Sequence, residues 1–519
     1  MFMSGTTDAP EPVSPSHQTV FLSIWSKYLP YSKRDNVKLS KRGKEMGFKD
    51  NRTFIEALAK TGDVVKINKE VDWDLEAAAI TGRSCELKGP ACLFENLKDY
   101  SAGGRIFGAP IATYRRLAIA MGMDPEVATG RIYDEYERRV AKPIKPVVVR
   151  DGPCKQKKMF GSEVNLYEFP SPTVHEGDGG RYMGTWHCVI TKDLDSDWTN
   201  WGMHRLMVYN RRMLCGYFTP ASHFALMRKK YKDAGKPMPA TVAIGVDPLS
   251  TVTACSPYRI GEDEADYAGA LNEEPVELIR CETNELLAPA HAEIVLEGEI
   301  LSDIELPEGP FGEFPGYRTQ GWAPQPVFVI KAITYRNNPI ICMTPEGIGT
   351  TDGKIGASLA GALGIKNRLR RRGVPVVSVS IPPEMGALVA VVSVRESSSQ
   401  IISEITSVIH GRRASLPKVI VVNEDIDVFD MDEVMHAFGT RLHPIRGVSA
   451  NPDCQGWTLT PYLDPEERSH NKIATGVYDC TWPAGWSKES DIPVRLSFKA
   501  SFPDALQKKV TDQWKEYGF

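Results

Sequence analysis

The segment Pro307–Tyr317, PEGPFGEFPGY, most constrains how this chain can fold, because it cannot form a regular helix. Its prolines lack a backbone donor and its glycines tolerate unusual dihedral angles, so we expect a rigid, bent loop. Such a loop can direct Glu308 and Glu313 into one cavity, where paired carboxylates separate their pKa values and leave one group as a proton donor. A surface turn with two solvated glutamates is the simpler interpretation. The aromatic residues Phe311, Phe314 and Tyr317 argue for a buried site, since a solvated turn needs no rings.

Composition limits the class of protein. The chain has 519 residues, of which 42% are hydrophobic and 25% are charged, as in a globular protein with about two to four domains. A net charge of −4 gives no indication of nucleic acid or an anionic membrane as a partner. The ten cysteines include no CxxC pair, which argues against a zinc ribbon or a dithiol redox centre. Dispersed thiols suit a reducing compartment, so we expect a cytoplasmic protein.

Residues 1–50 differ from the rest in being rich in Ser, Pro, Lys and Arg, and we expect an N-terminal extension there. Basic residues between Lys27 and Arg42 leave a mitochondrial presequence open, although Asp8 and Glu11 argue against one. The folded part is expected to begin near Asn51.

Helix and strand signals divide the remainder into regions of different class. They alternate over residues 51–155, which predicts an α/β domain in which Asp74 caps a helix over 75–83. Strand signals dominate residues 156–345, and a second α/β domain is expected over 346–500. Residues 501–519 predict a helix with one apolar face, which must pack on its own body or on a partner. The fold class is therefore α/β, or α+β, in several domains.

Polar groups gather in irregular sequence within the β-rich region, around Asn200, His223 and Glu264. Amide, imidazole and carboxylate groups suit a divalent ion, but their long separations carry no metal signature, and a lone histidine is more often structural. Arg205 has the fork geometry for a carboxylate or a phosphate. The glycines of Gly347–Gly353 approach GxGxxG with one extra residue and no acidic group to bind a ribose, so a Rossmann site is rejected.

The sequence resembles the UbiD family of reversible, non-oxidative decarboxylases that use prenylated FMN. The resemblance runs from about Asn51 to the C-terminus and is closest to the fungal ferulic and cinnamic acid decarboxylases and to the hydroxybenzoate (protocatechuate) decarboxylases. The segments that carry it are Asp74–Thr81, Trp198–Trp201, His204–Leu206, Glu308–Tyr317, Thr334–Asn338 and Glu424–Val428.

The resemblance implies an N-terminal α/β domain, a central split β-barrel that binds the flavin, and a C-terminal α/β domain with a terminal helix, assembled as a homodimer or a higher homo-oligomer. It also implies catalytic roles. Arg205 would hold the substrate carboxylate, Glu308 would orient Arg205, and Glu313 would protonate the product carbon. No side chain is a good electron sink, so such a reaction needs a cofactor.

The cofactor residues also follow from the resemblance. Asn200, His223 and Glu264 match ligands of a divalent ion, Mn²⁺ or Mg²⁺, that ties the cofactor phosphate to the protein. A K⁺ ion would lie near the Trp201 carbonyl and near the residues Thr253, Ala254 and Ser256. Positions that line or hold the flavin are Thr185, Ser222 and Arg412, the last beside a glycine that replaces the family's lysine. A flavin prenyltransferase would supply the cofactor.

The presumed substrate pocket departs from the ferulate-type pattern at Thr219, Phe314 and Trp457, and Leu459 is expected to line it as well. A more polar pocket filled with rings favours a small hydroxylated or heteroaromatic acid, of the hydroxybenzoate type. Ferulic, cinnamic or sorbic acid is the alternative within the family. An ordinary FMN oxidoreductase and a non-catalytic flavin-binding protein are alternatives of another class, which the absence of a nicotinamide fingerprint and the Glu–Arg–Glu match oppose.

Overall fold

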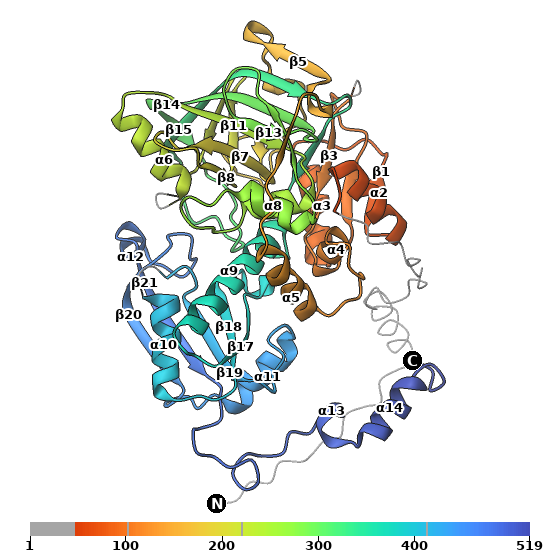
Figure 1. Cartoon of the computed structure of the whole chain (residues 1–519), viewed down its shortest axis with the longest axis vertical. Helices are drawn as coiled ribbons and strands as arrows, with labels where there is room; N and C mark the ends of the chain where they lie inside the picture. Colours follow the sequence, from red (N-terminus) through yellow and green to blue (C-terminus); the bar gives the residue numbers. More distant parts are fainter. Residues whose placement is uncertain (1–46, 101–102, 220–221, 412–413) are drawn as a thin grey trace, which may run out of the picture. The chain divides into compact units, whose positions relative to one another are not determined.

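A computed structural model describes residues 47–100, 103–219, 222–411 and 414–519 (Figure 1). Within these residues the strands form sheets of four, nine, three and five strands, with helices against them. The mixed α/β fold in several regions that the sequence predicts is therefore confirmed. Arg412 and the predicted extension up to residue 46 lie outside the described residues.

The N-terminal α/β region is built around the sheet β1-β2-β3-β16. Its first helix starts after Asp50, whose side chain accepts the Thr53 N–H, and stops at Gly62, which adopts a left-handed conformation with φ 71°. The elements are α2 Asn51–Thr61, β1 Val64–Ile67, α3 Glu76–Glu86, β2 Ala91–Phe94, β3 Arg105–Gly108, α4 Tyr114–Ala120, α5 Thr129–Val140 and β16 Ile340–Met343.

The predicted cap at Asp74 is wrong. Helix α3 begins at Glu76, and no side chain caps its first turn. The residue before it, Leu75, has φ 67°, so the chain turns sharply there, and Asp74 meets the helix through its carbonyl, which accepts the Glu76 N–H at 2.8 Å.

The central sheet contains nine strands, eight of them in the order β6-β9-β10-β15-β14-β11-β7-β8, with β5 paired to β15. Its longest strands, β14 and β15, form an antiparallel hairpin, and the loop 309–322 at its tip contains most of the proline- and glycine-rich segment. The strands are β5 Lys157–Phe160, β6 Tyr182–Gly184, β7 His187–Lys192, β8 Thr199–Gly202, β9 Leu206–Asn210, β10 Met213–Gly216, β11 Met238–Ile244, β14 Ile294–Glu308 and β15 Ala323–Tyr335.

Short helices and a small sheet, β13-β12-β4, accompany the central sheet. Apolar side chains from β11, β14 and β15 form a buried core on one face, as period-2 strands predict. The accompanying elements are β4 Val147–Val149, η1 Pro153–Lys155, η2 Gly161–Glu163, η3 Leu166–Glu168, α6 His223–Asp233, α7 Pro248–Ala254, α8 Glu264–Asn272, β12 Glu277–Arg280 and β13 Leu287–Pro289.

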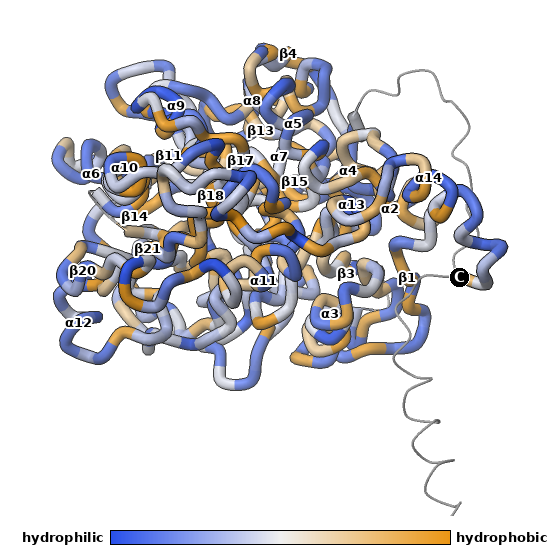
Figure 2. Tube along the Cα trace, turned by 90° about the horizontal axis from the view of Figure 1, so that it is seen from below, coloured by the Kyte–Doolittle hydropathy of each residue, from blue (hydrophilic) through white to orange (hydrophobic). Residues whose placement is uncertain are grey.

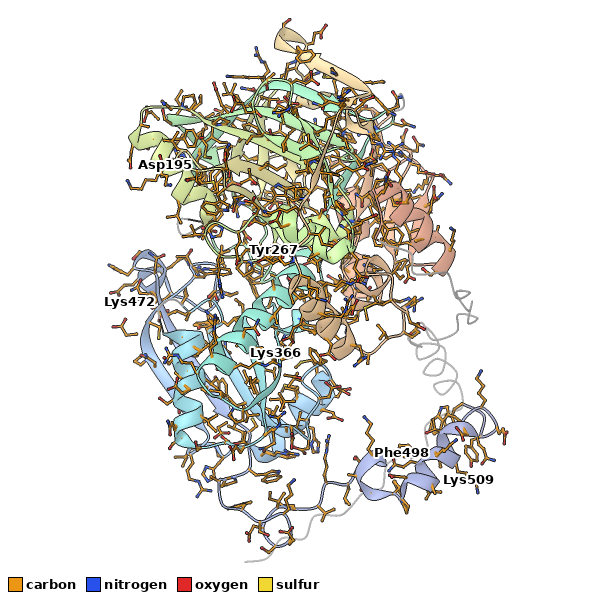
Figure 3. The ribbon with its side chains drawn as sticks, viewed as in Figure 1. Asp195, Tyr267, Lys366, Lys472, Phe498 and Lys509 are labelled. Atoms are coloured by element: carbon orange, nitrogen blue, oxygen red, sulfur yellow. The ribbon has the colours of Figure 1, made fainter. Side chains whose placement is uncertain are left out.

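The long helix α9, Asp352–Arg371, leads into the C-terminal sheet β17-β18-β19-β21-β20. Lys366 (labelled in Figure 3) and Arg370 on α9 bind Glu137 of α5, which fixes this helix to the N-terminal region. Hydrophilic residues dominate α12 in Figure 2. The elements are β17 Val376–Ser380, η4 Pro383–Met385, β18 Val389–Val394, α10 Ser399–His410, β19 Lys418–Asn423, α11 Met431–Arg441, β20 Val448–Gln455, α12 Pro465–Ser469 and β21 Lys472–Asp479.

The C-terminal tail forms α13, Phe498–Ser501, and α14, Asp504–Asp512, neither of which buries a residue. Its apolar side chains are open to water: Phe498 (labelled in Figure 3) is 44% exposed and Trp514 is 50% exposed. Packing of this apolar face on its own body or on a partner stays a prediction. Among the described residues, no helix has the length and apolarity that a membrane span needs.

Candidate active site

The three charged residues predicted to act together, Arg205, Glu308 and Glu313, are in contact. Arg205 donates from Nε to Oε1 of Glu308 at 2.9 Å and from Nη2 to Oε2 at 2.8 Å, the two-bond geometry of a strong arginine–carboxylate pair. Its Nη1 donates to Oε1 of Glu313. The side chains of Arg205, Glu308 and Glu313 are 9%, 1% and 13% exposed, so the cluster is largely shielded from water.

The curvature of the central sheet brings Arg205 to Glu308. Arg205 directly precedes β9 and Glu308 ends β14, and two strands, β10 and β15, lie between them in the sheet. Neighbouring strands are about 4.8 Å apart, so a flat sheet would hold these side chains too far apart for a two-bond pair. Glu313 comes from the loop 309–322, which turns back on itself because the Glu313 N–H donates to the Tyr317 carbonyl at 3.2 Å.

Aromatic rings surround the charged cluster. The Tyr182 hydroxyl donates to Oε1 of Glu308 at 2.8 Å, and its ring packs on Phe311 with centroids 4.3 Å apart. The Arg205 guanidinium lies 4.7 Å from the ring centre of Tyr217 and 5.4 Å from that of Phe311. Phe311 is 4% exposed, as expected for a loop that lines a buried site.

Burial sets the protonation behaviour of the cluster. It raises the pKa of Glu313, and the nearby Arg205 only partly offsets this effect. Burial by itself would lower the pKa of Arg205, but the hydrogen bonds that Arg205 donates to Glu308 and the negative charge of Glu313 outweigh burial and raise that pKa. The cluster therefore combines a permanent cation with a carboxyl group that holds a proton more readily than an exposed glutamate, as proton delivery requires.

The predicted divalent-ion ligands also converge. Asn200 lies in β8, His223 opens α6 and Glu264 opens α8. His223 Nδ1 is 3.2 Å from Asn200 Oδ1, and Glu264 Oε2 accepts the Trp201 N–H at 2.8 Å. The segment before α8 is fastened along β8 as well, since the Thr199 N–H donates to Asp263 at 2.9 Å.

The chemistry of this second cluster fits a divalent cation. Glu264 is 2% exposed, and burial raises its pKa to about 8. Among the described residues, no basic side chain forms an ion pair with it. Nor does that part of the chain hold a group of three His, Cys, Asp or Glu residues suited to a metal, so an ion here would need the Asn200 amide oxygen as a ligand.

The residues predicted to surround a K⁺ ion lie at the end of α7. Thr253 and Ala254 are its last residues, and the Ser256 hydroxyl donates to the Val252 carbonyl at 2.9 Å. Trp201 and Ala254 belong to the same buried apolar cluster. The Thr253 carbonyl already accepts the Ser256 N–H at 3.0 Å, so an ion here would use the second lone pair that a carbonyl oxygen keeps.

The predicted flavin-lining residues described here are buried or partly buried. Thr185 is 8% exposed, and its hydroxyl accepts the Thr344 N–H at 3.1 Å. Ser222 is the N-cap of α6, where its hydroxyl accepts the Ala225 N–H and donates to the Thr219 carbonyl at 2.7 Å. Ser222 is thereby coupled to Thr219, a predicted pocket residue.

The structure brings two of the predicted pocket residues together. The rings of Phe314 and Trp457 meet edge to face with centroids 6.0 Å apart. Gln320 in the same loop donates to Thr458 at 2.8 Å, so the segment 457–459 lies against the loop 309–322. Within the described residues, no hydrogen bond or ring contact joins Thr219 or Leu459 to this pair.

Sequence reasoning missed Tyr182 and Asp178, which contact Glu308 and the loop 309–322. Both lie in the segment Gly177–Tyr182, in which three glycines surround Asp178. This cluster of glycines was the signal that could have identified the segment, because glycines are typical of sites where two backbone segments approach closely.

A known protein family matches most of this chain. Models of the UbiD (3-octaprenyl-4-hydroxybenzoate carboxy-lyase) family match its N-terminal domain to residues 55–135, its Rift-related domain to 145–348 and its C-terminal domain to 356–477.

Characterised relatives cover nearly the same span. The chain is 34% identical over 489 residues to pyrrole-2-carboxylic acid decarboxylase from Pseudomonas aeruginosa, covering 91% of this chain and 98% of the relative. It is 30% identical over 500 residues to ferulic acid decarboxylase 1 from Saccharomyces cerevisiae, with 90% and 98% covered. An evolved dimeric form of the UbiD-class enzyme HmfF from Pelotomaculum thermopropionicum, in complex with prFMN, superposes with a TM-score of 0.74 at 26% identity and covers 88% of this chain and 99% of that one.

Proposed function

The chain belongs to the UbiD family of carboxy-lyases, and we propose that it releases CO₂ from a small aromatic acid, without net oxidation, using prenylated FMN. The observation that carries this proposal is the contact of Arg205 with both Glu308 and Glu313, largely shielded from water. It joins a group that binds a carboxylate to a group that carries a proton.

Arg205 binds the substrate carboxylate in this proposal. A guanidinium has five N–H donors, and Glu308 and Glu313 accept three of them here. The remaining donors serve a substrate carboxylate. Glu308, fixed at the end of β14 and by Tyr182, keeps the guanidinium plane in one orientation, so the scissile bond is held in one direction.

Glu313 supplies the proton that takes the place of CO₂ on the product carbon, and then takes another from water. Its pKa, raised by burial, keeps a fraction of the group protonated at higher pH than an exposed glutamate. The reaction balances because the carboxylate leaves as CO₂ and the electron pair of the broken bond accepts the proton.

Prenylated FMN, when bound, supplies the electron sink that side chains lack. Asn200, His223 and Glu264 would hold it through a divalent ion, Mn²⁺ or Mg²⁺, with Thr185, Ser222 and Arg412 near the flavin. Trp201, Thr253, Ala254 and Ser256 would hold K⁺. The uncompensated Glu264 carboxyl group supports the divalent ion.

The ring pair Phe314–Trp457 supports a compact substrate, either a hydroxybenzoate or a heteroaromatic acid. The relative that acts on pyrrole-2-carboxylic acid, at 34% identity, agrees with that size. Ferulate or cinnamate is the second candidate, which the 30% identity to a ferulic acid decarboxylase favours.

We also propose a homodimer or higher homo-oligomer whose contacts cover the apolar residues of α13 and α14, and a flavin prenyltransferase as the source of the cofactor. A dimeric relative supports the assembly. The ten cysteines are all free thiols, which supports a reducing compartment such as the cytoplasm.

The test is CO₂ release from a panel of acids by protein co-expressed with a flavin prenyltransferase. The panel contains protocatechuate, 4-hydroxybenzoate, pyrrole-2-carboxylate, ferulate and cinnamate. Turnover of a small acid but not of cinnamate supports the compact pocket, and turnover of cinnamate overturns it. Failure with every acid, while prenylated FMN is bound, contradicts the proposed activity. NAD(P)H-dependent flavin reduction would instead assign an oxidoreductase.

A further inference from the structure

The loop 309–322 has an external anchor in the glycine-rich segment 175–180, which none of the proposed roles includes. The Gly179 N–H donates to the Pro310 carbonyl at 2.7 Å, and the Gly312 N–H donates to Oδ1 of Asp178 at 3.0 Å. The two segments therefore meet immediately before Glu313.

Asp178 is the centre of this anchor. Its Oδ2 accepts the His175 N–H at 2.9 Å and lies 3.1 Å from His175 Nδ1, which fixes the carboxylate to its own turn. Its Oδ1 accepts from Gly312 and, at 3.2 Å, from the Arg318 guanidinium. The Asp178 side chain is 0% exposed. A carboxylate that only capped its own turn would leave Oδ1 to water, whereas here Oδ1 binds the loop on both sides of Glu313.

Arg318 fastens the far side of the loop. The same Nη2 that contacts Asp178 also donates to the Glu176 carbonyl at 2.6 Å. The Arg318 side chain is 35% exposed, so its contact with Asp178 is screened by water. It therefore stabilises the loop less than the shielded hydrogen bond from Gly312 does.

The packing leaves no room for the segments to slide. A Cβ at Gly179 would lie 2.0 Å from the Gly309 carbonyl oxygen, and a Cβ at Gly312 would lie 2.4 Å from His175 Nδ1. Phe311, between the two anchored residues, packs on Tyr182, whose hydroxyl holds Glu308. Phe311 and Tyr182 thus connect the anchor to the charged cluster of Arg205, Glu308 and Glu313.

We propose that Asp178 is a positioning residue for Glu313: by holding the Gly312 N–H and Arg318, it fixes the loop so that the Glu313 carboxyl group meets Arg205. This inference rests on the proposed function for the catalytic role of Glu313, but the anchor itself does not depend on any substrate. Catalysis is sensitive to such placement, since a displacement of about 1 Å can cost a factor of about 100 in rate.

Three variants are expected to weaken the anchor to different degrees. Asp178→Ala removes both oxygens, Asp178→Asn keeps one acceptor for donors that now compete, and Arg318→Ala leaves the Gly312 bond intact. A matched control is Glu297→Gln: Glu297 is also 0% exposed, accepts the Glu282 and Thr283 N–H groups and pairs with Lys155, but the loop it holds carries no proposed catalytic residue.

The first readouts are amide hydrogen exchange and crystal structures of the proteins without substrate. We expect exchange at Gly312 to accelerate about tenfold or more in Asp178→Ala, less in Asp178→Asn and least in Arg318→Ala, as loss of one hydrogen bond implies. The Glu313–Arg205 contact should be lost in Asp178→Ala. In Glu297→Gln only residues 282–283 should exchange faster. Unchanged exchange and an unmoved Glu313 in Asp178→Ala would overturn the proposal.

The second readout is the division between kcat and KM. Asp178→Ala should lower kcat at least about tenfold, because the loop places the acid Glu313, and should raise KM less, because Arg205, which binds the substrate carboxylate, lies outside the loop and only Phe314 of the loop lines the proposed pocket. Glu297→Gln should keep the wild-type kcat. A fall in kcat of the same size in Glu297→Gln, in proportion to lost thermal stability, would reduce Asp178 to a structural role. If wild-type protein releases no CO₂ at all, the proposed function fails, and the exchange and crystal data still decide whether Asp178 holds Glu313.

Discussion

Glu313 and Glu264 are two carboxyl groups of the central region that are largely shielded from water, and they differ in what lies beside them. Burial raises the pKa of both. Glu313 contacts the guanidinium of Arg205, whereas Glu264 pairs with no basic side chain among the described residues and accepts hydrogen bonds from backbone N–H groups, among them that of Trp201. The first site holds its counter-charge within the protein, and the second does not.

This difference indicates which chemistry each site can perform. A carboxyl group beside a permanent cation can release and regain a proton without leaving an isolated buried charge. A buried carboxyl group with no cation beside it must stay neutral or bind a cation from solution. The comparison therefore predicts proton transfer at Glu313 and cation binding at Glu264. A separate substitution can test each of these two roles.

The largest effect is expected from Glu313→Gln. An amide keeps an acceptor for Arg205 but cannot deliver a proton, so decarboxylation should fall by a factor of about 10²–10⁴ while the fold is retained. The measurement is CO₂ release with thermal unfolding as the check on folding. Glu305→Gln, on the same hairpin but paired with Arg228 near the surface, serves as the control and should keep its activity. Activity within tenfold of wild type in Glu313→Gln would exclude Glu313 as the proton donor.

The next effect concerns Glu264→Gln and added Mn²⁺. Wild-type protein without cofactor should be stabilised by Mn²⁺, by about 3 kcal/mol at a hundredfold excess over the dissociation constant, and the variant should not. Thermal unfolding at rising Mn²⁺ concentration measures both. Glu262→Gln, whose side chain accepts the Arg259 N–H nearby, should respond like wild type. An equal response in Glu264→Gln would place the ion elsewhere.

Asp352→Asn sharpens the comparison with a third kind of buried carboxyl group. Asp352 is 0% exposed, accepts the Ile111 N–H at 2.5 Å and has no ion-pair partner in the part of the chain that the structure describes. Burial raises its pKa to about 6. Because the folded-state pKa lies above the unfolded one, the stability that protonated Asp352 contributes is complete below about pH 4 and is lost as pH rises through about 6.

Asparagine at this position keeps the acceptor for Ile111 and cannot ionise. The variant should therefore gain about 2 kcal/mol on wild type between pH 4.5 and pH 7.5. Urea unfolding of both proteins across that range measures the difference. A stability difference that does not change with pH would show that Asp352 does not titrate in this window.

The smallest effect is expected from Tyr182→Phe. It removes one of three hydrogen bonds that Glu308 accepts, while both bonds from Arg205 remain. The free energy of unfolding should fall by about 1.5 kcal/mol, with a fall of a few-fold in kcat. Chemical unfolding and initial rates measure the two, with Tyr209→Phe, an exposed tyrosine of β9, as the control. A change no larger than that of the control would show that Arg205 alone fixes Glu308.

Much of this architecture was predictable from local sequence. The segment containing Glu308 and Glu313 is distinctive because proline and glycine exclude a regular helix, and Gly62 ends the first helix in the left-handed conformation that glycine favours. The extent of β14 was not predictable: the strand continues beyond Ile300 to Glu308, because pairing with β15 overrides the polar residues at its end. Tyr182 and Asp178 were missed because their partners lie 126 and 134 positions away, and only the folded chain brings them together.

The contact of Gly179 with Gly309 also affects how this site can be re-used in protein engineering. A designer who transfers only Glu308–Tyr317 onto another hairpin would carry over both carboxyl groups. The graft would lose the segment around Gly179, whose backbone can approach the loop closely because glycine has no side chain. The transferable unit is instead the pair of segments 175–182 and 308–318, together with the residue that supplies the guanidinium. Because any side chain at Gly179 meets a carbonyl oxygen, sequence libraries for such a graft should keep that glycine fixed and vary the exposed positions around it.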